Sequence, residues 1–283
     1  MQSRINFFAV ILALALTSMI ASGAGPAGAE RGGARSEADE KAVWNIWRAH
    51  LASSNNHEAV IASFRQTPQN APGNSLFAVA RGLCAWHLLQ LSKTNEAVQM
   101  LEDMTSAKPD SAPNAAGAEM GRRWLTRIDR ENVRRALGGY YRREIAYPPS
   151  LESLKKTPRV PAPPLTDRWN VPWIYSLAGF QTIKGLDNQH YLLQSAQLKD
   201  ASDLKTMLAR PYADTIKLKP VSVTTTASGV QNVRFETNEI KGQKARIILM
   251  AEGTKSETIT LVYVGNKIII LSDGDYWMIM PKP

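Results

Sequence analysis

The chain contains the segment YPPSLESL at Tyr147–Leu154, followed by PLTDRWNVPWIY at Pro164–Tyr175. A helical pattern over Gly117–Glu144 precedes the first segment. Two strand-like runs, Phe180–Ile183 and Tyr191–Ser195, follow the second one. These patterns predict a long helix, a connection rich in proline and aromatic residues, and a β-hairpin that packs on the helix.

The helix expected over Gly117–Glu144 carries an apolar stripe that does not keep one direction. Its expected inward residues are Trp124, Leu125, Ile128, Val133, Leu137, Tyr140 and Tyr141. Ile128 and Val133 are five residues apart, whereas one helical face repeats every three or four residues. The stripe therefore drifts, or the helix bends, near Arg130.

The region around the two quoted segments resembles the major pseudopilin of type II secretion systems. In that family a helix ends in a Tyr, a Tyr-Pro pair and a short Leu-bearing helix follow, and a Pro-Leu-x-Asp-x-Trp-x-x-Pro-aromatic-x-Tyr run enters a small sheet. The matching positions here are Tyr140 or Tyr141, Tyr147 with Pro148, Leu151 and Leu154, and Leu165 to Tyr175. The resemblance covers roughly residues 120–204. It implies a pilin-like helix-plus-hairpin module in a cell-envelope protein, with Asp167, Trp169 and Tyr175 as fold determinants, and it implies no catalytic mechanism.

The same resemblance implies one metal site, because a loop after the second strand of the pseudopilin sheet holds calcium. The matching stretch is Ser195–Leu204, in which Asp200 and Asp203 offer carboxylate oxygens, the ligands that calcium prefers. The glycine that follows the serine in the family is Ala196 here, and Lys199 lies beside the acids. Asp203, with Ser202, is also placed to cap a short helix. We favour the cap and expect no cofactor, with weak calcium binding as the alternative.

The N-terminus has the pattern of an export signal. A positive end with Arg4 precedes an apolar run over Phe7–Leu16, and Ala27-Gly28-Ala29 offers a small-x-small cleavage site. Residues 1–29 are therefore expected to be a signal peptide, with an uncleaved anchor as the alternative, and residues 30–39 a disordered leader. The expected location is periplasmic or extracellular. A pseudopilin begins differently, so this chain is not expected to polymerise as one.

The chain is basic, with a formal charge of +9 and a sequence pI near 9.7. A basic surface attracts anionic material, which for an exported protein means lipid headgroups, cell-wall polymers or acidic proteins. Basic residues interleaved with aromatic residues in a nucleic-acid pattern are absent from the sequence. Cys84 is the only cysteine, so no internal disulfide can form, and its neighbours predict a small buried side chain.

Residues 40–119 have the pattern of helical hairpins. Ala85, Leu88, Ala97, Leu101 and Pro109 lie at spacings similar to a tetratricopeptide repeat, although the signature Trp and Gly of that repeat are missing. A generic helical bundle is the alternative. Trp44 and Trp47 lie on the first helix, beside the expected leader, and we expect at least one of them to be partly exposed for protein binding. Burial of both is the alternative, and it is favoured more for Trp47.

Residues 211–283 alternate in the manner of short strands separated by turns, including tight turns at Gly265-Asn266 and Asp273-Gly274. The expected fold class is thus α+β. It comprises a helical domain at 40–119, a pseudopilin-like module at 120–210 and a small antiparallel β domain at 211–283.

No set of residues in the sequence points to catalysis. The four histidines, His50, His57, His87 and His190, have no metal-binding spacing, and glycine-rich phosphate loops are absent. Asp187, His190 and Ser195 are close in sequence, but Ser195 lacks the glycines of a nucleophile elbow. We therefore expect a non-enzymatic envelope protein that binds other proteins as a scaffold, in or beside a secretion or pilus-type apparatus. A module that binds anionic cell-wall or extracellular polymer is the second reading, and a hydrolase is the third.

Overall fold

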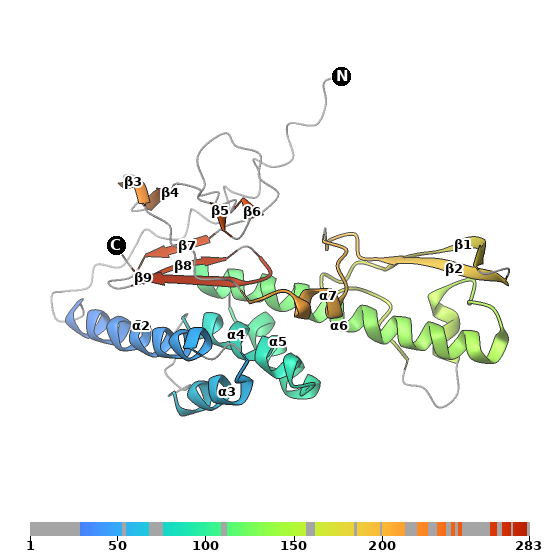
Figure 1. The fold of residues 1–283 in the computed structure, drawn as a ribbon, viewed down its shortest axis with the longest axis horizontal. Coiled ribbons are helices and arrows are strands. Elements are labelled where there is room, and N and C mark those ends of the chain that lie inside the picture. Colours follow the sequence, from blue (N-terminus) through green and yellow to red (C-terminus); the bar gives the residue numbers. More distant parts are fainter. Residues whose placement is uncertain are drawn as a thin grey trace, which may run out of the picture. The chain divides into compact units, whose positions relative to one another are not determined.

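The computed structural model describes residues 29–52, 55–67, 76–108, 112–156, 162–183, 186–198, 200–212, 220–225, 231–235, 239–240, 243–244, 261–264, 268–272 and 274–281 (Figure 1). The chain divides into two compact units, residues 1–38 and 39–283. Most of the expected signal peptide, residues 1–28, lies outside the described residues. Within the described residues, no helix is both long enough and apolar enough to cross a membrane.

The described chain combines helices with antiparallel strands. Its helical elements are α2 (Ala29–Ala52), α3 (His57–Gln66), α4 (Phe77–Gln90), α5 (Thr94–Ser106), α6 (Ala112–Glu144), the 3₁₀ helix η1 (Leu151–Lys156) and α7 (Leu204–Ala209). Its strands are β1 (Ile174–Ile183), β2 (Leu186–Gln194), β3 (Pro220–Thr225), β4 (Gln231–Phe235), β5 (Glu239–Ile240), β6 (Gln243–Lys244), β7 (Leu261–Val264), β8 (Ile268–Ser272) and β9 (Trp277–Pro281). Residues 30–39, expected as a disordered leader, have helical backbone in α2.

Helix α4 is the centre of the helical part, because almost every residue from Phe77 to Leu89 is buried. Helices α3 and α5 pack against it, and α6 packs against α5. Glycines let α6 approach closely. A Cβ atom added at Gly121 would lie 2.8 Å from the Leu101 carbonyl oxygen, and one added at Gly117 would lie 2.8 Å from Ala78 Cβ.

Helix α6 contributes to two hydrophobic cores. Its first half, through Ile128, joins the core made by α2 to α5, and its second half, from Val133, joins a core with η1 and the β1–β2 hairpin. The five-residue step between Ile128 and Val133 is the point where the buried face passes from one core to the other. The helix runs unbroken through this step.

The last strands belong to the first core. Strands β7, β8 and β9 form an antiparallel sheet in that order, and Ile270, Tyr276, Trp277 and Ile279 pack with the helices. Residues expected to form a separate β domain therefore share the core of the expected helical domain. The connection from β8 to β9 is also longer than a two-residue turn, because Ser272 pairs with Trp277.

The second core joins the segments Tyr147–Leu154 and Pro164–Tyr175. Trp173 is buried, and its indole Nε1 donates a 2.9 Å hydrogen bond to the Pro164 carbonyl oxygen. The Tyr175 hydroxyl donates a 2.7 Å bond to the Pro148 carbonyl oxygen. Trp169 is only half-buried and donates to Glu119, so Trp173 is the main aromatic residue of this core.

Replacing Trp173 with alanine should therefore lower the free energy of unfolding by about 3–5 kcal/mol, the usual cost of a Trp-sized cavity. Trp169→Ala, which removes a half-buried ring, is the matched control and should cost less. Chemical denaturation of both variants measures the difference. Equal losses would contradict the assignment of Trp173 to the core.

Candidate functional site

The middle of α6 carries a buried polar turn between the two cores, formed by Thr126, Arg127, Asp129 and Arg130. All four residues are at most 6% exposed. Buried charges are costly unless they are paired and hydrogen-bonded. The partners of this turn therefore decide which segments are held against α6.

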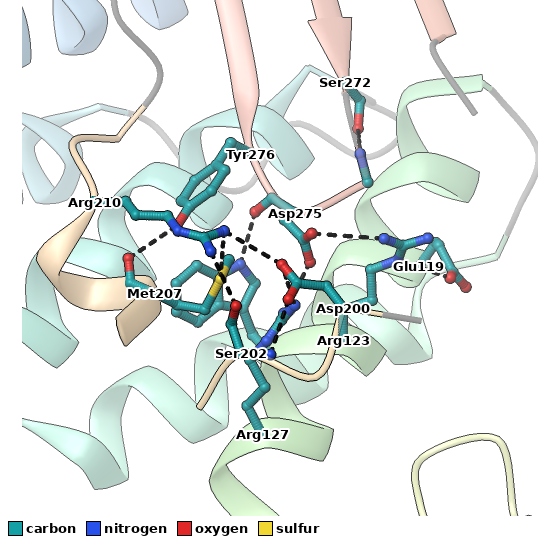
Figure 2. A network of polar contacts seen from close by, with 12 residues as sticks. Glu119, Arg123, Arg127, Asp200, Ser202, Met207, Arg210, Ser272, Asp275 and Tyr276 are labelled. Atoms are coloured by element: carbon teal, nitrogen blue, oxygen red, sulfur yellow. Dashed lines mark hydrogen bonds and ion pairs between the residues drawn. The ribbon is translucent and has the colours of Figure 1, made fainter. Parts of the chain in front are cut away.

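Arg127 is paired with the turn that precedes β9. Its Nη1 lies 2.8 Å from Asp275 Oδ1, and the Trp124 indole donates a 2.7 Å hydrogen bond to the Asp275 carbonyl oxygen (Figure 2). Arg123 forms an ion pair with the other carboxylate oxygen, with its Nη1 3.6 Å from Asp275 Oδ2. Figure 2 shows Asp275 between these α6 side chains, so this contact fastens the C-terminal strands to the helix.

Asp129 and Thr126 hold the segment Pro164–Tyr175 against α6. Arg168 forms a two-pronged ion pair with Asp129, and its backbone N–H donates a 3.3 Å bond to Thr126 Oγ1. Burial raises the pKa of Asp129, while the hydrogen bond and charge of Arg168 act in the opposite direction. Glu102 lies 3.3 Å from Arg168, which ties the same side chain to α5.

Asp167 organises the turn that follows. Its Oδ1 accepts 3.0 Å bonds from the backbone N–H groups of Trp169 and Val171, and its Oδ2 accepts a 2.6 Å bond from the Ser195 hydroxyl. Ser195 in turn accepts from the N–H groups of Gln197 and Leu198. Asp167 and Ser195 are both buried, so this is a structural link between the turn and the end of β2.

A cavity of about 430 Å³ lies beside the polar turn and is bounded by α6, Tyr147 and β2. Its lining residues are Arg130, Arg134, Tyr147, His190, Tyr191, Leu192, Leu193, Gln194 and Ala201. Arg130 donates a 2.6 Å bond from Nη2 to the Ser202 carbonyl oxygen, while its buried Nε has no hydrogen-bond partner. The buried His190 Nε2 also has none. Burial, with the charges of Arg134 and Arg127, lowers the pKa of Arg130.

Three of the four histidines form a hydrogen-bonded row that the sequence did not reveal. His50 Nδ1 lies 3.0 Å from His87 Nε2, and His57 Nδ1 lies 2.8 Å from His87 Nδ1. A neutral imidazole has one N–H, so His87 donates in one contact and accepts in the other. Because the contacts use opposite nitrogens of His87, the three rings do not converge on one point. In the described part of the chain, no group of three potential ligands is placed to hold a metal ion.

The residues expected to bind calcium have other partners. Asp203 is the N-cap of α7 and accepts a 2.7 Å bond from the Thr206 N–H, which confirms the expected cap. Asp200 accepts a 2.8 Å bond from the Ser202 N–H, and its Oδ2 lies 3.3 Å from Arg210 and 3.9 Å from Arg127 (Figure 2). These bonds and neighbouring cations lower the pKa of Asp200 despite its partial burial.

The two tryptophans expected to bind proteins differ. Trp47 is fully buried, so it cannot serve as a docking residue. It contacts the ring of Tyr212, a residue from the segment after α7 that the helical pattern could not place. Trp44 is half-buried, and the Arg48 guanidinium lies 5.2 Å from its ring centre. Cys84 is buried as expected, and burial raises its thiol pKa to about 12.

Comparisons with known proteins gave no relative. No family model matches the sequence, and neither a curated protein nor a solved structure matches it.

The histidine row predicts a pH dependence of stability. Burial, together with His50 and His57, lowers the pKa of His87 to about 3, whereas an unfolded histidine titrates near 6.5. The unfolded chain binds more protons in this range, so stability is full above about pH 6.5 and falls as the pH is lowered. For His87 alone the loss approaches about 1.4 kcal/mol per pH unit.

Denaturant unfolding between pH 7 and 5 measures this slope, in a range where most carboxylates stay ionised. His87→Gln removes the titrating group and should flatten the profile. An unchanged slope in that variant would contradict a neutral, buried His87.

Proposed function

We propose that this protein is an exported, non-enzymatic binding protein of the cell envelope that presents its β1–β2 hairpin to another protein, in or beside a secretion or pilus-type apparatus. The observation that carries the proposal is the exposure of large apolar side chains on the hairpin. Of the five described large apolar residues that are exposed, three lie on the hairpin: Ile174 and Leu192, which share its outer face, and Leu177, which pairs with Tyr191 on the other face. Clustered apolar exposure is typical of interaction sites.

The register of the hairpin separates its two faces. Tyr175 pairs with Leu193, and both pack into the second core. Ile174 pairs with Gln194, and Ser176 pairs with Leu192. Since neighbouring residues on a strand point to opposite faces, Ile174 and Leu192 lie on the face turned away from the core. This outer face, with Ser176 and Gln194 between the apolar residues, is the proposed protein-binding surface.

The finer architecture is part of the same proposal. The long helix, the hairpin and the link from Tyr175 to Pro148 support a pilin-like module. The packing of α3 and α5 on α4 supports a repeat-like helical region. A signal peptide cleaved before Glu30 would deliver this chain to the periplasm or the exterior.

A second protein-binding surface is proposed on α2. Trp44 is half-buried and Leu51 is exposed, seven residues apart and therefore on the same helical face. Arg48 lies between them on this face, over the Trp44 ring. A half-exposed Trp beside an arginine is a combination enriched at protein interfaces.

The test compares capture of envelope proteins by the full-length mature chain and by variants. The double variant Ile174→Ser, Leu192→Ser removes the apolar outer face and should weaken capture about tenfold or more, because each buried aliphatic side chain is worth about 1.5–3 kcal/mol. Ile145→Ser is the matched control, since Ile145 is exposed but lies outside the hairpin. Trp44→Ala tests the α2 surface separately.

The hairpin proposal fails if the double variant keeps its fold, judged by circular dichroism, and still captures the same proteins at the same salt concentration. It also fails if Ile145→Ser weakens capture equally.

A further inference from the structure

The cavity between α6 and β2 has the chemistry of an oxyanion site. Two of its described lining residues are arginines, two are tyrosines and one is a histidine, and none of them carries a carboxylate. A volume of about 430 Å³ lies in the range of small-molecule sites. We propose that this cavity binds a carboxylate or phosphate group carried by a small ligand or by one unit of an anionic polymer.

The main support is the state of Arg130. Its side chain is 2% exposed, and its one recorded bond goes to the Ser202 carbonyl oxygen. In the described chain, no carboxylate lies within ion-pair distance of Arg130, and its buried Nε has no acceptor. Glu131 and Asp203 act on Arg130 only by Coulombic attraction from beyond ion-pair distance. A buried charge without a direct partner is costly, and an oxyanion in the cavity would supply both a direct charge partner and an acceptor.

The neighbouring arginine on α6 provides an internal comparison. Arg127 is equally buried and its Nε likewise has no hydrogen-bond acceptor, but Asp275 lies 2.8 Å away and Asp200 lies 3.9 Å away, so its charge is balanced within the chain. The acids nearest in sequence to Arg130 and Ser202 have other bonds. Glu131 pairs with Arg134 at 2.8 Å, and Asp203 caps α7. Arg130 therefore differs from Arg127 in lacking a carboxylate partner.

The other lining groups favour an ionised ligand. The His190 Nε2 is buried without a partner and can donate a hydrogen bond to the ligand in the tautomer protonated there. Tyr147 and Tyr191 also line the cavity, and burial raises the pKa of both hydroxyls. Arg130, Arg134 and His190 thus offer N–H donors to an oxyanion in the cavity.

Titration calorimetry and thermal melting of the full-length chain at constant ionic strength test the proposal, with sodium glucuronate, inorganic phosphate and the neutral sugar glucose as probes. We expect glucuronate or phosphate to bind and raise the melting temperature, while glucose and added chloride leave it unchanged. Binding of glucuronate but not phosphate would identify a carboxylate ligand, and the reverse a phosphate ligand; both results support the site.

Arg134→Gln and Arg135→Gln form a matched pair, because they are adjacent on α6 and only Arg134 lines the cavity. Arg134→Gln should weaken anion binding about tenfold, since it removes a charge-assisted bond, and Arg135→Gln should not. Tyr191→Phe tests the contribution of the tyrosine hydroxyl on the β2 side of the cavity, without changing the charge of the cavity. The proposal is overturned if neither anion binds, or if Arg135→Gln weakens binding as much as Arg134→Gln. Leu192 and Gln194 line the cavity as well as lying on the outer face of the hairpin, but Arg134→Gln and Arg135→Gln leave that face unchanged, so their result does not bear on the hairpin surface.

Discussion

The structure depends on one constraint: the turn Thr126–Arg130 of α6 is buried although three of its residues carry charge. Each of these charges must find compensation, and the available groups come from segments far away in the sequence. Asp275 comes from the turn before β9, Arg168 from the segment before β1, and Ser202 from the segment before α7. The polar turn thereby fixes where these three segments lie on the helix.

The polar turn also explains why two cores can share one helix. Apolar packing ends at Ile128 on one side and resumes at Val133 on another. Between Ile128 and Val133, the contacts are ion pairs and hydrogen bonds, which are directional, whereas apolar packing by itself is not. Arg127 and Asp129 are balanced by carboxylate and guanidinium partners, whereas Arg130 is held by a carbonyl oxygen alone. The same feature that connects the cores thus leaves Arg130 beside a cavity, with no described carboxylate in ion-pair contact.

Local patterns in the sequence predicted some of the elements, although not the helical backbone of residues 30–39. The long helix, the hairpin, the cap at Asp203 and the burial of Cys84 follow from periodicity, turn residues and capping chemistry, which act between near neighbours. Long-range pairings could not be predicted in this way. His87 lies 37 residues after His50 and 30 residues after His57, and only the packing of α2 and α3 on α4 brings the three together. Burial was favoured more for Trp47 than for Trp44, but the residue that contacts its ring, Tyr212, is too distant in the sequence to have been predicted. The cavity was missed for the same reason, since it combines α6 with β2.

The most direct test of this account concerns the pair Arg127 and Asp275. Asp275→Ala leaves the buried Arg127 without its closest partner, so the account predicts a loss of about 3–5 kcal/mol in the free energy of unfolding. Arg127→Met combined with Asp275→Ala removes both charges and should recover much of that loss. Chemical denaturation of both variants and of the parent chain gives the comparison. A loss below about 1 kcal/mol for Asp275→Ala, where removing one partner of a buried pair should cost several times more, would contradict the account, and so would a double variant as unstable as the single one.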